Sequence, residues 1–295
     1  MTQLTRDSTT SSTDASAGAL ARRSPAPRAE SGVLRLWRSS WRALAFLAVA
    51  AVAWWLVTAR GWVQPYILPS PGETFGNLVE YTPYFLQHTW ITTYETVLGF
   101  LIAVVLGELV AILMVRSKNL ELTIYPIILV AQVIPKIAIA PLFVVWLGFG
   151  MGPKITVAVL MAFFPIVISG LAGLRSVDPE ILDLAKTMGA SKIKTFAKIQ
   201  FPASLPQLLS GMKVAATLAV TGAVVGEFVG GNEGLGYVIL RANGNMDTAT
   251  LFAALIIMSV IGILLFAVIQ LAENLLIPWH ASRRTDDDSP VVPQA

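Results

Sequence analysis

The sequence predicts an all-α integral membrane protein with six transmembrane helices, and three observations support this fold class. Of its 295 residues, 55% are hydrophobic and only 13% are charged, whereas soluble domains carry about 25% charged residues. Several apolar runs reach the roughly 20 residues that span a bilayer core as a helix. These runs do not alternate between apolar and polar residues, as the strands of a membrane β-barrel do.

The order of the elements follows from the apolar runs. Two tails, 1–35 and 281–295, are poor in large apolar residues and are expected to be disordered and cytoplasmic. The domain between them, 36–280, is expected to hold the membrane helices. The predicted third helix is interrupted by Pro135 and Pro141, and proline disrupts helical hydrogen bonding. The six predicted helices are 43–59, 88–115, 122–147, 155–174, 212–229 and 250–277.

The distribution of Lys and Arg predicts how the chain crosses the membrane. If the N-terminus lies in the cytoplasm, seventeen of the 21 Lys and Arg residues lie inside and three lie outside, namely Arg60, Lys154 and Arg241. The remaining one, Lys136, falls within the membrane. Since cytoplasmic loops are rich in positive charge, both termini are predicted inside a plasma membrane. The loop between the fourth and fifth helices is then cytoplasmic.

That loop, 178–202, has the pattern of a short helical hairpin. Asp178 and Pro179 are typical of a helix start, and Gly189 suits a helix stop that needs a positive φ. Ser191 is a second helix cap, and Pro202 is expected to end the second helix. An apolar stripe at i, i+3, i+4 and i+7 runs along the first helix, and its members are Ile181, Leu184, Ala185 and Met188.

Two physical interpretations of this hairpin are open. Lys192, Lys194 and Lys198 beside an apolar ridge are typical of a segment that lies on anionic lipid. The same arrangement is typical of a helix that docks into the groove of a soluble partner.

The hairpin resembles the EAA loop of ABC-transporter membrane subunits, which reads E-A-A, three residues, G, nine residues, I-x-L-P. Here Asp183, Leu184 and Ala185 stand at the E-A-A positions, Gly189 follows after three residues, and Ile199 to Pro202 follow after nine. Asp for Glu, Leu for Ala and Phe201 for Leu are departures. The resemblance implies that the loop is a coupling helix seated on an ABC ATPase subunit. ATP and Mg then bind to that partner, and this chain carries no G-x-x-x-x-G-K-[ST] phosphate loop.

Four further segments resemble the nitrate, sulfonate and taurine group of binding-protein-dependent permeases, which includes pyrimidine and riboflavin carriers. They are ILPSPGETF (67–75), QVIPKIAIAPLFVVWLGFG (132–150), GAVVGEFVGGNEGLGY (222–237) and PWH (278–280). The second is most similar to the pyrimidine and riboflavin carriers. The resemblance implies an importer with two permease copies, a homodimer, and an extracytoplasmic substrate-binding protein. Its cargo would be a small anion or a vitamin precursor. No role in nucleic-acid binding is expected.

Charged and helix-breaking residues within the apolar runs indicate a translocation path. A carboxylate in the membrane is costly unless it faces protein or water, and broken helices often border such a path. The candidate path residues are Pro135, Lys136, Pro141, Glu108 and Glu227. Glu95 is expected to reach the membrane interface. For each charge, the alternative is a paired or snorkelling side chain, and a Glu108–Lys136 pair is one such arrangement.

Small residues recur every four positions along two of the predicted helices, namely Gly99, Ala103, Gly107 and Ala111, and Gly222, Gly226 and Gly230. Such spacing lets helix backbones approach closely. The seam is either ordinary packing within the chain or, as favoured for the fifth helix, a surface that slides during transport.

Two other function classes are alternatives for this sequence, a secondary transporter and a membrane enzyme. An ion-gradient-driven secondary transporter typically shows an internal repeat and intramembrane ion sites, and neither is evident. A membrane enzyme needs a nucleophile motif, a metal-ligand cluster or paired carboxylates, and with no cysteine and two histidines the sequence offers no catalytic or metal site.

Overall fold

The computed structural model describes residues 32–277 and divides the chain into two units between Ala53 and Trp54. Most of the expected 1–35 tail, the whole 281–295 tail and the 278–280 motif lie outside the described residues. The described part of the first unit is helical and belongs to α1 (Gly32–Ala59). Helix α1 therefore begins inside the segment expected to be a tail. Among its described side chains, Phe46 and Leu47 are apolar and exposed, by 72% and 61%.

The second unit contains the long apolar helices. Four runs are long and apolar enough to cross a membrane: α3 (Thr82–Arg116), α6 (Met151–Leu174), the continuous run Lys192–Gly230 and α11 (Thr248–Leu276). A fifth span results if α4 (Lys118–Val133) and α5 (Lys136–Leu147), bent by 98°, are one broken span. The predicted first span corresponds to the shorter apolar stretch Leu44–Ala59. The all-helical membrane fold is confirmed for the described residues, and the count of six stays a prediction.

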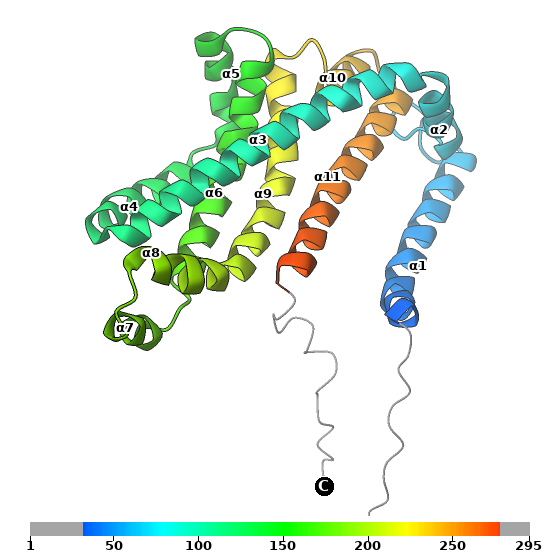
Figure 1. The fold of residues 1–295 in the computed structure, drawn as a ribbon. Helices are drawn as coiled ribbons and strands as arrows, with labels where there is room; N and C mark the ends of the chain where they lie inside the picture. The colour runs from blue at the N-terminus through cyan, green and yellow to red at the C-terminus, as the bar shows by residue number, and fades with distance from the viewer. Residues whose placement is uncertain (1–31, 278–295) are drawn as a thin grey trace, which may run out of the picture. The chain divides into compact units, whose positions relative to one another are not determined.

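Shorter helices connect these spans. Helix α2 (Pro71–Glu80) starts with a capping box, because Ser70 and Glu73 each bond the other's backbone N–H. Helices α7 (Pro179–Thr187) and α8 (Lys192–Thr195) form the hairpin, and a π-helical turn, η1 (Phe196–Gln200), leads into α9 (Phe201–Gly230). Helix α10 (Leu235–Gly244) precedes α11. Within the second unit, α7 and α8 lie at the opposite end from α2 and α10 (Figure 1).

Helix α6 is the centre of the second unit and packs against α3, α5 and α9. Small residues let the backbones of α3, α6 and α9 approach closely. An added Cβ on Gly222 would lie 2.6 Å from the Cα of Ala158, and one on Gly226 would lie 2.6 Å from the Cα of Lys154. A Cβ on Gly99 would likewise meet Ala158. The small-residue seams of α3 and α9 thus pack within the chain against α6, and the expected sliding surface on α9 is not needed to explain them.

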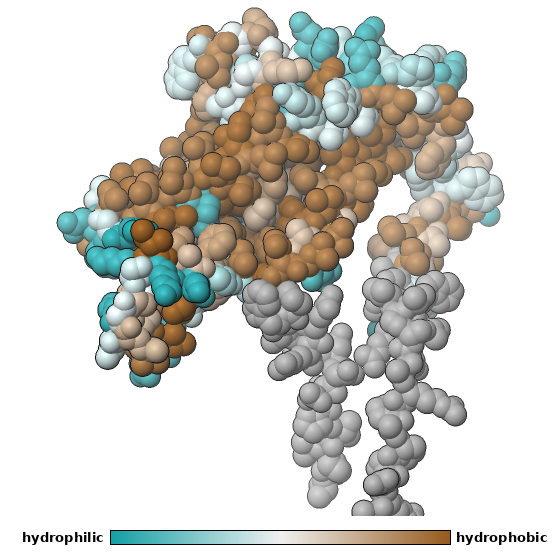
Figure 2. Space-filling view, in the orientation of Figure 1, coloured by the Kyte–Doolittle hydropathy of each residue, from teal (hydrophilic) through white to brown (hydrophobic). Residues whose placement is uncertain are grey.

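The surface of the second unit is divided between apolar flanks and polar ends. Figure 2 shows hydrophobic residues along the flanks of the long helices, with hydrophilic residues gathered near α10 and near α7. On α11, Ile263, Leu264 and Val268 are exposed by 59–66%. An apolar belt between two polar ends is what a bilayer requires of a spanning bundle.

Candidate functional site

The hairpin begins as the sequence predicts. The Asp178 carboxylate accepts a hydrogen bond from the backbone N–H of Glu180 at 3.0 Å, and Pro179 opens the helix. Gly189 has a φ of +76°, the left-handed conformation that favours glycine. Ser191 then accepts a hydrogen bond from the N–H of Lys194 at 3.3 Å and caps α8. Sequence-local chemistry therefore sets both starts and the turn between them.

The apolar stripe of α7 is mostly uncovered. Ile181, Leu184 and Met188 are exposed by 49%, 60% and 78%, while Ala185 is buried and faces inward. Ile193 on α8 is also exposed, by 71%. Several large apolar side chains therefore lie uncovered on a polar hairpin, a pattern that is typical of interaction surfaces.

The second arm of the hairpin does not end where the sequence predicts. Pro202 lies in the first turn of α9, where its missing N–H is tolerated, so it does not stop the helix. The chain instead continues from α8 through the π turn into α9, with the N–H of Phe201 bonding the carbonyl of Phe196. Ile199 lies in this turn. The hairpin is therefore continuous with a long apolar helix.

A buried polar cluster lies at the other end of the same unit. The Lys154 ammonium is 2.9 Å from the Glu95 carboxylate, and their side chains are only 5% and 0% exposed. Lys154 also donates to the carbonyl of Glu233 at 3.1 Å. Lys154 lies within α6 rather than before the predicted fourth helix, and Glu95 is a paired charge, the alternative stated for it above. Both are charge-paired inside the bundle, as a buried charge requires, although the second carboxylate oxygen of Glu95 has no hydrogen-bond partner among the described residues.

Glu227 belongs to the same cluster. Its carboxylate accepts a hydrogen bond from the Thr92 hydroxyl at 2.6 Å and another from the backbone N–H of Gly236. Thr92 in turn accepts from the N–H of Leu235 at 2.7 Å, and His88 Nδ1 accepts from the N–H of Gly234 at 2.9 Å. These bonds fasten the start of α10 to α3. Residues 59 to 146 positions apart in sequence meet here, so no local pattern reveals the cluster.

Glu108 and Lys136 do not pair. The Lys136 ammonium donates to the carbonyl of Gln132 at 3.0 Å and lies 4.8 Å from the centre of the Phe164 ring. Both carboxylate oxygens of Glu108 are buried and have no hydrogen-bond partner among the described residues. They lie against Gly170, where an added Cβ would meet them. The absence of a side chain at Gly170 gives this carboxylate its room.

The third predicted span is broken at Pro135 but not at Pro141. Helix α4 ends at Val133 and α5 begins at Lys136, with Ile134 and Pro135 in extended conformations between them. Pro141 lies inside α5 and does not break it. The residue before a proline is steered out of the helical region, and at Pro135 this coincides with the bend of 98°.

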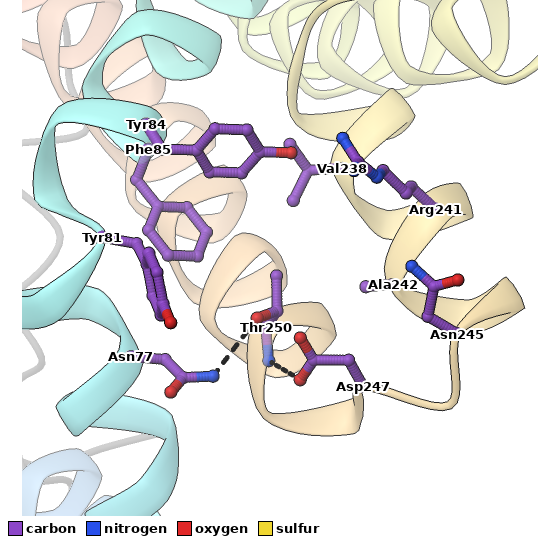
Figure 3. A pocket seen from close by; sticks show the side chains of 10 residues that line it. All are labelled: Asn77, Tyr81, Tyr84, Phe85, Val238, Arg241, Ala242, Asn245, Asp247 and Thr250. Atoms are coloured by element: carbon purple, nitrogen blue, oxygen red, sulfur yellow. Dashed lines mark hydrogen bonds between the residues drawn. The ribbon is translucent and has the colours of Figure 1, made fainter.

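A cavity of about 360 Å³ opens between α2, the start of α3 and the helices α10 and α11. Figure 3 shows Tyr84 and Arg241 pointing toward one another across it, with Tyr81 and Asp247 nearby. Asn77 donates to the Thr250 hydroxyl at 3.2 Å, and Asp247 caps α11 by accepting from the N–H of Thr250 at 3.1 Å. Its aromatic and charged lining suits a polar ligand or a side chain of a partner. Over residues 32–277, no three His, Cys, Asp or Glu side chains are grouped as metal ligands.

A comparison with family models matches residues 99–278 to the binding-protein-dependent transport system inner membrane component. The chain is 40% identical over 227 residues to the formylaminopyrimidine transport permease protein of Halalkalibacterium halodurans, covering 77% of this chain and 91% of the relative. It is 33% identical over 249 residues to the putative aliphatic sulfonates transport permease protein of Bacillus subtilis, covering 83% and 90%.

The fold also matches a solved structure. A chain of the MetNI methionine ABC transporter, in inward-facing conformations, superposes with a TM-score of 0.57 at 20% identity, covering 68% of this chain and 97% of that one. At this identity the likeness concerns the arrangement of helices alone.

Proposed function

Because this chain belongs to the family of binding-protein-dependent transport system inner membrane components, the permeases of ABC importers, we propose that its 178–202 hairpin couples transport to a separate ATPase subunit. The proposed contact residues are Ile181, Asp183, Leu184, Ala185, Met188, Gly189, Ile199 and Pro202. ATP and Mg bind to the ATPase subunit, and this chain transmits the resulting motion.

The observation that carries this proposal is the uncovered apolar ridge of α7. Leu184 and Met188, exposed by 60% and 78%, stand on a capped helix that projects between two spanning helices. A short amphipathic helix of this kind fits a groove on a soluble partner. The buried Ala185 and the glycine turn hold the ridge in one orientation. The cytoplasmic side of this loop, and of both termini, is part of the proposal and agrees with the charge distribution.

Leu184→Asp tests the coupling surface, with Thr187→Asp as the matched control. Both positions are exposed on α7, and both variants gain one carboxylate, but only the first interrupts the apolar ridge. We expect Leu184→Asp to reduce the amount of ATPase subunit that copurifies with the chain by about tenfold or more, as for an interface hot spot. Thr187→Asp should copurify like the wild type. Equal retention by the two variants contradicts the coupling role.

The translocation path is proposed to run beside the bend between α4 and α5. Pro135, Lys136 and Pro141 lie at or beside this bend, and discontinuous helices border the path in many transporters. Glu108, whose carboxylate lacks a partner within residues 32–277, is a second candidate for the path. Glu227 bonds Thr92 and Gly236, so its proposed contribution is to hold α10 at the end of the path.

The partners follow from the same proposal. A second copy of this chain completes the path, forming a homodimer, and an extracytoplasmic binding protein delivers the cargo. The cavity between Tyr84 and Arg241 lies beside α2 and α10, at the end of the unit opposite the hairpin (Figure 1). We assign it to contact with that binding protein.

The cargo is proposed to be a formylaminopyrimidine-type vitamin precursor, because a relative at 40% identity is named for its transport. An aliphatic sulfonate is the second candidate, from the relative at 33% identity. Uptake of each labelled compound by cells that express the complete transporter decides between them. Pyrimidine uptake that depends on this chain supports the first assignment, and uptake of the sulfonate alone replaces it.

A further inference from the structure

A second cavity, of about 440 Å³, lies between the hairpin and the last turns of α3. Its lining is divided by chemistry. Ile112 of α3, Leu182 of α7 and Phe196 of the π turn give it an apolar wall, and Arg116, Lys186 and Lys192 give it a basic rim. The coupling proposal uses the outer ridge of α7 and leaves this inner cavity unassigned.

The positive charge of the rim is not neutralised by the residues around it. Among residues 32–277, Lys186 pairs with Asp183 at 2.7 Å, whereas Arg116 and Lys192 take part in no ion pair. The Arg116 guanidinium lies 5.8 Å from the centre of the Phe196 ring, a cation–π contact that orients it without cancelling its charge. Three cations and one carboxylate therefore leave the rim basic.

The position of the cavity indicates what kind of anion enters it. Arg116 is the last residue of α3, an apolar helix of 35 residues long enough to cross a membrane, so the rim lies at one end of a candidate membrane span. Basic pockets between spanning helices at this depth bind phospholipid headgroups. An apolar wall beside the cations fits the glycerol and first methylenes of a lipid, which free phosphate lacks.

We propose that this cavity binds the phosphate group of an anionic phospholipid, with Arg116 and Lys192 as its principal ligands. A lipid held there contacts both α3 and the hairpin, and therefore ties the position of the hairpin to the adjoining leaflet. The proposal rests on the cavity and its charges. It concerns lipid binding by this chain and can hold or fail independently of the ATPase contact.

The test is lipid retention by the purified full-length chain, measured by native mass spectrometry after addition of phosphatidylglycerol or phosphatidylcholine. The wild type should retain phosphatidylglycerol preferentially, and Arg116→Ala/Lys192→Ala should lose that retention by about tenfold. The matched control is Lys194→Ala/Lys198→Ala, which removes the same charge, two cations, from hairpin positions outside the cavity. It should bind like the wild type. Equal retention by the two double variants overturns the proposal.

Three further measurements distinguish a bound lipid from misfolding, from a free anion and from a protein contact. Arg116→Lys/Lys192→Arg keeps the charge and should restore binding, so loss through misfolding is separated from loss of cations. Millimolar inorganic phosphate should leave the bound lipid in place. Displacement by phosphate would assign the cavity to the free anion instead. Loss of ATPase-subunit copurification from the Arg116→Ala/Lys192→Ala variant in lipid-free detergent would make the rim a protein contact. Either result overturns the lipid assignment.

Discussion

Lys154 supplies the counter-charge of a carboxylate buried inside the bundle. Its partner Glu95 is completely buried, and a buried carboxylate that loses its counter-charge costs far more than a surface pair is worth. We expect Lys154→Met to lower the free energy of unfolding by about 3–5 kcal/mol. Denaturation of the purified chain in detergent, followed by tryptophan fluorescence, measures this change.

A double variant distinguishes an orphaned charge from lost packing. Glu95→Leu/Lys154→Met removes both charges, and well-packed apolar replacements of a buried pair are often neutral or stabilising. The double variant should therefore recover most of the stability that Lys154→Met loses. A double variant as unstable as the single one would contradict the ion-pair explanation.

Gly189 is a second residue whose role is local and testable. At a φ of +76°, a β-branched residue is strained by about 1–2 kcal/mol, whereas Asn enters this conformation readily. We expect Gly189→Val to leave the chain folded but to reduce ATP-driven uptake, because the turn that orients the apolar ridge is distorted. Gly189→Asn should keep most of the uptake. Wild-type uptake by both variants would contradict the role of this turn in orienting the apolar ridge.

At the scale of elements, the contact between α6 and α9 depends on the absence of side chains. A methyl group on Gly226 would lie 2.6 Å from the Cα of Lys154, and backbone does not yield as the end of a side chain does. We expect Gly226→Ala to lower the free energy of unfolding by about 1–3 kcal/mol. Gly262 in α11 has nothing within 4 Å of an added Cβ. Gly262→Ala should be neutral or raise stability by up to about 1 kcal/mol, and an equal loss at both sites would exclude the close-approach argument.

The elements differ in how well the sequence predicts them. Long apolar runs and the caps at Asp178 and Ser191 depend on residues near one another in the chain, so the spanning helices and the hairpin were predictable. The effect of each proline was not, because proline breaks a helix only where the surrounding packing also bends it. Pro135 lies at a bend, whereas Pro141 and Pro202 lie within helices.

The buried polar cluster of Lys154, Glu95 and Glu227 could not be predicted from the sequence, for a different reason. Lys154 follows Pro153 at the start of an apolar helix and has the appearance of a loop charge. Only the packing of α3 against α6 brings Glu95, 59 positions away, to its ammonium. Likewise, Glu227 was singled out as a charge in the membrane, but its link to α10 through Gly236 depends on a chain reversal that no periodicity encodes.

At the scale of the whole molecule, the prediction concerns the source of energy. Liposomes that contain this chain with its ATPase subunit and binding protein should take up cargo when ATP is supplied on the hairpin side. Liposomes that contain this chain alone should show only background uptake under an imposed proton or sodium gradient. Flux assays with labelled cargo measure both. Gradient-driven uptake by the lone chain would favour the secondary-transporter alternative over the ABC importer.

The continuous helical run Lys192–Gly230 sets both the distance and the rotation about the helix axis between the hairpin and Glu227. It is 39 residues long, and each residue inserted into a helix turns everything beyond it by about 100°. One residue inserted after the π turn would rotate the hairpin about the helix axis relative to Glu227. Seven inserted residues would return it to within about 20° of its original orientation. The spacing between these regions is therefore constrained to whole turns.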